Sequence, residues 1–324
     1  MDSTRSNHSK WTLAGVLISL GIVFGDIGTS PLYVIQAIVG DRTVSKELIY
    51  GGVSCVFWTL LIVSTVKYVI LALNADNKGE GGIFALYARV RRYNPKLVIY
   101  PAMIGCATLI SDGFITPPVS ISSAVEGIHV LYPTMEINTI PIVCGIIIAL
   151  FVFQQVGTQV VGLAFGPIMT LWFTMLGILG IKELIHYPQI LQAINPVYAV
   201  ELLTQYPKGF WLLGSVFLCT TGAEALYSDL GHCGKQNIRI SWLFVWIMLL
   251  LNYFGQSAWV LNNHDGMPIN ENTRIFYALM PQWFLPFGLG IAVLAAIIAS
   301  QALISGVFTL VNEAMKLKLW LKMK

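Results

Sequence analysis

Residues 21–33 read GIVFGDIGTSPLY, and they place one acidic side chain, Asp26, near the middle of an apolar block that covers residues 11–39. A block of this length can cross the roughly 30 Å hydrocarbon layer of a membrane. A carboxylate that faces lipid at mid-depth costs about 3 kcal/mol or more, so we expect Asp26 to face a cavity or a partner group.

The residues around this acid favour an interrupted helix. Gly25 and Gly28 permit non-helical backbone, and Pro31 cannot donate a hydrogen bond to the carbonyl of Ile27. A carbonyl that is freed inside a membrane needs another partner, and a dehydrated cation is one such partner. The stretch therefore predicts a membrane-spanning helix that is broken at mid-depth and offers oxygen atoms to a cation.

The composition of the whole chain agrees with a membrane protein. Of its 324 residues, 56% are hydrophobic and 11% are charged, whereas soluble domains carry about 25% charged residues. We expect one all-α integral membrane domain over residues 1–324, because no linker or low-complexity segment interrupts the apolar pattern. The blocks long enough to be spans number about eight and cover residues 11–39, 49–73, 97–131, 138–154, 158–181, 209–230, 238–261 and 283–313.

The placement of lysine and arginine predicts the orientation of these spans. Cytoplasmic loops of membrane proteins carry an excess of basic residues. If the N-terminus lies in the cytoplasm, thirteen basic residues fall on the inside and five fall outside. Both termini are therefore predicted to be cytoplasmic. The five outer residues are Arg42, Lys46, Lys182, Lys208 and Arg274, and the inner ones are Arg5, Lys10, Lys78, Arg89, Arg91, Arg92, Lys96, Lys235, Arg239, Lys316, Lys318, Lys322 and Lys324.

Two more apolar blocks combine an acid with helix-breaking residues. Residues 109–127 read LISDGFITPPVSISSAVEG and contain Asp112, followed by Pro117 and Pro118, which we also expect to interrupt their helix. Residues 219–229 read CTTGAEALYSD and contain Glu224. Three blocks thus hold a buried acid, a breaker and nearby hydroxyl groups.

The spacing of the polar residues predicts that they share helix faces. Asp112, Thr116 and Ser120 recur at every fourth position, so a continuous helix places them on one stripe. In the other two blocks, Asp26 and Tyr33 are seven positions apart, and Thr221 and Glu224 are three apart. Carboxylate, hydroxyl and carbonyl oxygens are the ligands that hard cations prefer, so together these residues favour a cation pathway.

Plainer explanations are available for single residues. Proline and glycine in membrane helices often only kink them, and a lone buried acid could pair with Lys67. That lysine lies near the cytoplasmic end of the second block and can instead extend its amine to the membrane surface. These explanations do not account for the same combination in three blocks.

Other function classes find little support in the sequence. The net charge of +3 is small and scattered, which argues against a nucleic-acid surface. No spacing of serine, histidine and acid indicates an enzyme, and no cofactor or resident metal site is expected. Five cysteines, four of them inside apolar blocks, imply no disulfide framework.

Several stretches resemble the KUP/HAK/KT family of potassium uptake permeases. The most specific is GDIGTSPLY, residues 25–33. The others, in the expected order along nearly the whole chain, are ADNKGEGGI (75–83), FITPPVSISSAVEG (114–127), TGAEALYSDLGHCGK (221–235), LNYFGQ (251–256) and ASQALISGVF (299–308).

The resemblance implies the fold of the amino acid–polyamine–organocation superfamily, in which five spans are repeated in inverted orientation and spans one and six are broken. It also implies potassium:proton symport into the cell across the plasma membrane, and a possible homodimer. Many family members have Glu at the position of Asp112, which is one methylene shorter. The ion-binding residues implied by matching motifs are Asp26, Tyr33, Asp112, Thr116, Ser120, Thr221 and Glu224.

Length is the main departure from the family, whose members have further spans and a cytoplasmic C-terminal domain. The resemblance therefore implies an incomplete inverted repeat, as a fragment or a natural truncation, and we expect no transport by the 324 residues alone. The alternatives are a symporter of the same fold that carries amino acids or other cations, a membrane-embedded enzyme and a non-transporting remnant. An amino-acid carrier would use unwound backbone amides to bind a carboxylate, which a cage of acids does not provide.

Overall fold

The computed structural model describes residues 11–93, 95–135, 137–154, 159–270 and 273–317. These residues form helices and no strand, which confirms the all-α prediction. The elements of the first part of the chain are α1 (Leu13–Ile22), α2 (Gly25–Thr29), η2 (Ser30–Leu32), α3 (Val34–Val39), α4 (Lys46–Thr59), η3 (Leu60–Leu71), η4 (Ala72–Asn74), α5 (Ile83–Val90), α6 (Pro95–Val125) and α7 (Gly127–Leu131).

The second part of the chain contains the longest helix and the most fragmented segment. Four short elements, η6 to α12, follow one another between Gly209 and Ser228. The elements are α8 (Ile140–Gln154), α9 (Gln159–His186), η5 (Pro188–Ile194), α10 (Pro196–Gln205), η6 (Gly209–Leu212), α11 (Leu213–Phe217), η7 (Leu218–Thr220), α12 (Ala225–Ser228), α13 (Leu230–Cys233), α14 (Lys235–His264), α15 (Ile275–Ala278) and α16 (Leu285–Lys316).

Side-chain caps fix the beginnings of two helices. The hydroxyl of Thr12 accepts a hydrogen bond of 3.0 Å from the backbone N–H of Gly15 at the start of α1. Ser45 does the same for Leu48 at the start of α4, at 3.2 Å. Each cap satisfies a backbone donor that has no partner within its own helix.

Six helical segments of the described chain are long and apolar enough to cross a membrane. A seventh forms if Leu13–Ile22 and Gly25–Leu32 count as one span bent by 66°. The chain is therefore an integral membrane protein in which seven of the expected blocks have a matching segment. The fourth block corresponds to α8, whose apolar part, Ile140–Val152, is shorter than the others. The six are Lys46–Asn74, Leu97–Leu131, Phe165–His186, Gly209–Ser228, Lys235–His264 and Leu285–Lys316.

One expected helix interruption is absent. Helix α6 runs continuously from Pro95 to Val125 with Pro117 and Pro118 inside it, so the prediction that these prolines break the helix was wrong. A proline removes one helical hydrogen bond, and membrane helices tolerate that loss where neighbouring groups satisfy the freed backbone. The unbroken helix keeps the four-residue spacing of its polar stripe intact.

Close helix packing rests on small residues. Helix α9 packs along both α1 and α14. Where α9 meets α14, a Cβ atom added to Gly255 would lie only 2.5 Å from the Cα of Gly180. Glycine at both positions lets the two backbones touch, which is how membrane helices gain packing energy without a hydrophobic driving force.

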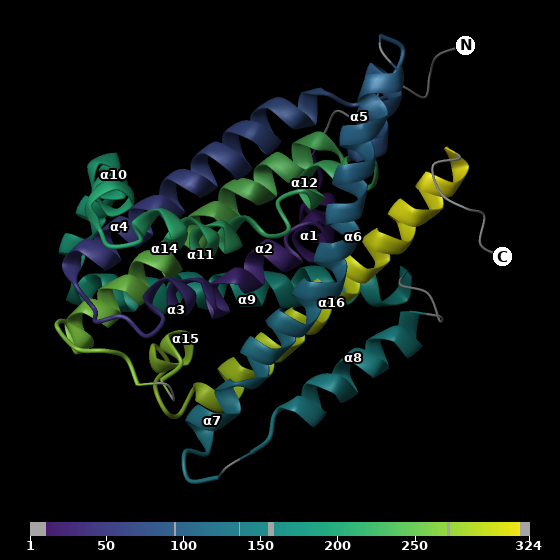
Figure 1. Ribbon diagram of the computed structural model, residues 1–324. Helices are drawn as coiled ribbons and strands as arrows, with labels where there is room; N and C mark the ends of the chain where they lie inside the picture. The colour runs from purple at the N-terminus through teal and green to yellow at the C-terminus, as the bar shows by residue number, and fades with distance from the viewer. Residues whose placement is uncertain (1–10, 94, 136, 155–158, 271–272, 318–324) are drawn as a thin grey trace.

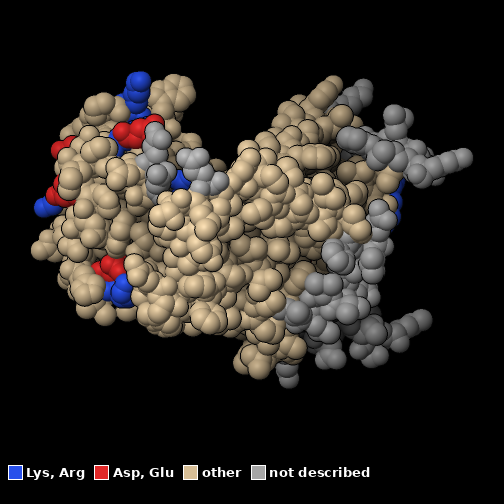
Figure 2. Space-filling view, turned by 90° about the horizontal axis from the view of Figure 1, so that it is seen from below, with Lys and Arg blue, Asp and Glu red and all other residues tan. Residues whose placement is uncertain are grey.

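Helix α16 forms the other long contact surface. It packs along α6 and also touches α2 and α9, while α8 contacts both α6 and α16; Figure 1 shows α6 and α16 crossing, with α8 beside them. On the face shown in Figure 2, most charged side chains lie toward one end, some basic ones show at the opposite edge, and the broad middle carries none. Such a belt is what a lipid-facing surface requires.

Candidate ion-binding site

Two interrupted helical segments touch each other inside the protein. The first bends by 66° between α1 and α2. The second loses helical geometry at Thr221, where ψ is 131°, and at Gly222, where φ is +83°. A Cβ atom on Gly222 would lie 2.6 Å from the Cβ of Asp26 and 2.9 Å from the backbone N of Ile27. The interruption of the second segment is therefore pressed against the acid of the first.

Three acids come together at this contact. Asp26 is buried, and it interacts electrostatically with both Glu224 and Asp112. The carboxyl groups of Glu224 and Asp112 also interact with each other. The Oδ2 atoms of Asp26 and Asp112 are both buried without a hydrogen-bond partner. Unpaired carboxylate oxygens of this kind are able to accept a cation or a proton.

Hydroxyl groups surround the acids. The Thr116 hydroxyl donates a hydrogen bond of 2.7 Å to Oδ1 of Asp112. The Tyr33 hydroxyl lies 3.3 Å from Oγ of Ser30, and Ser120 lies close enough to Tyr33 to interact with it. Both Thr116 and Ser120 are buried. The stripe on α6 thus faces the interrupted first span.

No basic side chain neutralises this cluster among the residues that the structure describes. The ion pairs found there are Lys182–Glu183 and Arg274–Glu126, and neither includes one of the three acids. Lys67 is exposed, and its amine lies 4.8 Å from the centre of the Tyr68 ring. The alternative that a buried acid pairs with Lys67 is therefore not realised.

The seven residues expected to bind ions fall into two groups. Asp26, Tyr33, Asp112, Thr116, Ser120 and Glu224 are brought together by the contacts described above. Thr221 supplies the non-helical backbone directly before Gly222. Of the expected helix-breaking residues, Gly25 begins α2, Gly28 lies inside it, and Pro31 lies in the 3-10 turn η2.

Sequence reasoning missed one residue of the first interrupted span, Thr29, and three residues that contact this span. Thr29 lies 3.3 Å from Ser120, hydroxyl to hydroxyl. Gly222 belongs to the TGAEALYSDLGHCGK motif, but the motif did not indicate that the backbone of Gly222 contacts Asp26. Trp172 and Gln256 each donate a hydrogen bond to a backbone carbonyl of the span. Gln256 ends the LNYFGQ motif, whereas no pattern distinguished Trp172 from the other tryptophans.

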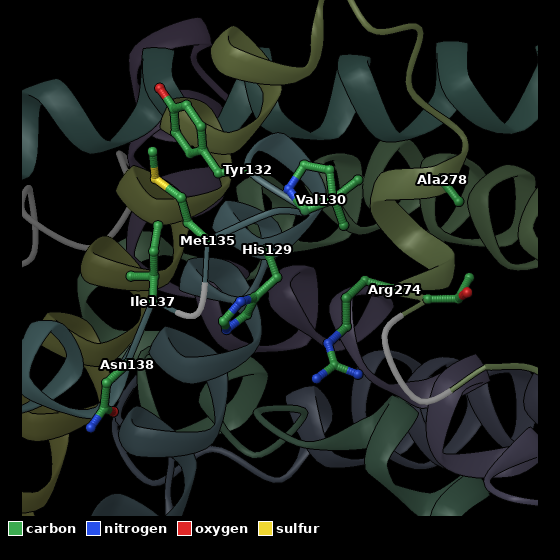
Figure 3. A pocket seen from close by; sticks show the side chains of 10 residues that line it. His129, Val130, Tyr132, Met135, Ile137, Asn138, Arg274 and Ala278 are labelled. Carbon is green, nitrogen blue, oxygen red and sulfur yellow. The ribbon is translucent and has the colours of Figure 1, made fainter.

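An open pocket of about 720 Å³ lies between α7, the loop that follows it and the region of α15 (Figure 3). At its edge, Nε of Arg274 lies 2.9 Å from Oε2 of Glu126. None of the expected ion-binding residues lines this pocket. The lining residues are His129, Val130, Tyr132, Pro133, Met135, Ile137, Asn138, Thr273, Arg274 and Ala278.

Comparison with known proteins supplies the family. The model of the K+ potassium transporter integral membrane domain matches residues 13–324. Two curated relatives, both described as a probable potassium transport system protein Kup, come from Flavobacterium johnsoniae and Cytophaga hutchinsonii. The first is 57% identical over 327 residues, covering 99% of this chain and 50% of the relative. The second is 59% identical over 328 residues, covering 100% of this chain and 49% of the relative.

The similarity extends to relatives of lower identity. The Enterococcus faecalis protein of the same description is 50% identical over 332 residues, covering 98% of this chain and 50% of that protein. No solved structure matches the chain. The chain spans about half the length of the curated relatives it matches. The extent and identity of these matches show that the chain belongs to the K+ potassium transporter family.

Proposed function

We propose that this chain forms the ion-binding membrane core of a potassium transporter, and that the complete transporter carries K+ into the cell together with protons. The observation that carries the proposal is the meeting of Asp26, Asp112 and Glu224 where two interrupted helical segments touch. Three acids without a basic partner among the described residues form a strongly cation-attracting site. The names of the relatives, which describe potassium transport, support K+ as the cation.

The chemistry of the site also suits a proton. Two neighbouring carboxyl groups that interact, such as Asp112 and Glu224, cannot both be ionised without strong repulsion. We propose that one proton resides on this pair and that Asp26 is ionised when K+ is bound, so that its charge offsets the dehydration of K+. The Tyr33, Thr116 and Ser120 hydroxyls and the non-helical backbone at Thr221 complete the oxygen environment.

The proposal extends to the architecture of the transporter. The bent first span and the non-helical residues of Gly209–Ser228 support the inverted-repeat fold with broken spans one and six. Within it, α8 would be the fourth of eight spans in a single transmembrane domain. The cell membrane, cytoplasmic termini and homodimer formation belong to the same proposal. An amino-acid carrier is disfavoured because three acids would repel a substrate carboxylate.

A complementation experiment tests this function. The chain is joined to the residues of the Flavobacterium johnsoniae relative that it does not cover and is expressed in bacteria that lack potassium uptake systems. Growth at low potassium and uptake of radiolabelled Rb+ are expected. Normal insertion of the joined protein into the membrane without any Rb+ uptake would contradict the proposal.

A further inference from the structure

Two side chains from distant helices hold the backbone of the interrupted first span. The indole N–H of Trp172 donates a hydrogen bond of 2.8 Å to the carbonyl oxygen of Gly28. The amide Nε2 of Gln256 donates one of 2.8 Å to the carbonyl oxygen of Pro31. Both acceptors lie between Asp26 and Tyr33, the two residues of this span that the site uses.

Both hydrogen bonds come from side chains that are buried away from water. Trp172 is 0% exposed and Gln256 is 1% exposed, so water cannot replace either donor. A backbone carbonyl that lost its donor at this depth would remain unsatisfied, which strongly disfavours the observed backbone shape. The two donors therefore stabilise one conformation of residues 28–31.

Each donor is itself held in place. Oδ1 of Asn252 accepts a second hydrogen bond, of 2.7 Å, from Nε2 of Gln256, and Nδ2 of Asn252 donates one of 2.9 Å to the carbonyl of Leu176. This chain of bonds fixes which way the Gln256 amide faces.

The indole is fixed by packing. The ring of Trp172 packs against Phe276 of α15, with ring centres 5.5 Å apart. Next to it on α9, Phe173 would lie 2.6 Å from a Cβ atom at Gly28. Helix α9 therefore meets the interrupted span directly at the carbonyl that Trp172 binds.

We propose that Trp172 and Gln256 are positioning residues that hold residues 28–31 in the shape that directs Asp26 and Tyr33 at the cation. Neither residue touches the cation. The N–H donors of these two residues occupy the carbonyl oxygens of Gly28 and Pro31. These oxygens are therefore not used to bind the cation, and the side chains of Asp26 and Tyr33 bind it instead. Binding sites depend on such support, since small displacements of ligands weaken selection by size. This inference rests on the proposed function.

Binding of radiolabelled Rb+ to the purified chain in detergent, with KCl and NaCl as competitors, tests the inference. Trp172→Phe and Gln256→Met remove the donors and keep most of the side-chain shape. Each is expected to raise the Kd for Rb+ at least about tenfold, since a buried carbonyl loses its partner. Each is also expected to reduce the preference for K+ over Na+, while the number of binding sites per folded chain stays unchanged.

Trp58→Phe is the matched control. The Trp58 indole also donates to a backbone carbonyl, that of Ile194, at 3.0 Å, but away from the interrupted span. Its removal is expected to leave the Kd and the K+ preference unchanged.

The outcomes separate the two hypotheses. Wild-type chain that binds no Rb+ would refute the proposed function, and this inference with it. Wild-type binding with an unchanged Kd in both variants would refute only the positioning role. A lower number of sites at unchanged Kd would indicate a purely structural role and would also overturn the inference.

Discussion

The backbone of Gly222 lies directly against the side chain of Asp26. A Cβ atom at position 222 would lie 2.6 Å from the Asp26 Cβ and 2.8 Å from its Oδ2. Gly222 also has a φ of +83°, a conformation that other residues rarely adopt. The site therefore depends on a residue that has no side chain, at the point where two interrupted segments meet.

Gly222→Ala is expected to abolish Rb+ binding, because the new methyl group both strains the backbone and displaces Asp26. Backbone strain alone costs about 1–2 kcal/mol. Gly214→Ala is the control, since a Cβ there would meet no atom within 4 Å. Rb+ binding by the purified variants checks this, and full binding by Gly222→Ala would contradict the described contact.

Asp26→Asn is expected to abolish cation binding while leaving membrane insertion intact. The substitution keeps the shape of the side chain but removes the charge that offsets cation dehydration. Asp41→Asn, which changes an exposed acid, provides the control. Rb+ binding and the amount of protein in purified membranes are measured together. An unchanged Kd in Asp26→Asn would remove Asp26 from the site.

Thr116→Val is expected to weaken Rb+ binding about threefold to tenfold, the usual effect of losing one hydrogen bond. The variant leaves Oδ1 of Asp112 without its 2.7 Å donor and preserves side-chain volume. Thr108→Val is the control on the same helix. The Thr108 hydroxyl lies away from the site and bonds only to the carbonyl of Gly105. Equal effects of the two substitutions would argue against a specific role for Thr116.

The carboxyl group of Asp229, which lies outside the membrane-spanning segments, is expected to make the stability of the folded protein depend on pH. It follows the span Gly209–Ser228, and burial raises the pKa of its carboxyl from 3.8 to about 6, against the opposing effect of His232. The folded state binds the proton of this carboxyl more tightly than the unfolded state does. Protonation of Asp229 therefore stabilises the folded state at low pH, and this stabilisation is lost as pH rises through about 6.

Asp229→Asn should therefore raise the Tm of the purified protein more at pH 8 than at pH 5. The difference corresponds to about 1 kcal/mol, since one pKa unit is worth about 1.4 kcal/mol. Thermal unfolding at the two pH values measures it. A Tm gain that is the same at both pH values would exclude the Asp229 carboxyl as its cause.

The sequence alone predicted that Asp26 is shielded from lipid and that its helix is interrupted, because both depend on local composition. A buried carboxylate in an apolar block is unfavourable in lipid, and Gly25 with Pro31 disrupts helical hydrogen bonding nearby. The same local reasoning failed at Pro117 and Pro118, where the helix continues through both prolines. Whether a proline breaks a membrane helix depends on its neighbours, which a local pattern does not contain.

The supporting residues could not be predicted because their contacts are long-range. The bond from Trp172 to Gly28 spans 144 positions, and that from Gln256 to Pro31 spans 225. Nothing in the spacing of an isolated tryptophan indicates which carbonyl it will reach. Gly222 could have been suspected, since a glycine beside a buried acid in a motif often marks close backbone approach.

We propose above all that a potassium-like cation binds where Asp26, Asp112 and Glu224 meet. Anomalous diffraction from crystals of the purified protein grown in Rb+ tests this binding most directly, because it locates the ion. A strong peak is expected in contact with Asp26 and with the hydroxyl of Tyr33, and it should disappear in Asp26→Asn. A peak confined to the pocket beside Arg274, or well-diffracting Rb+ crystals without a peak at the three acids, would contradict it.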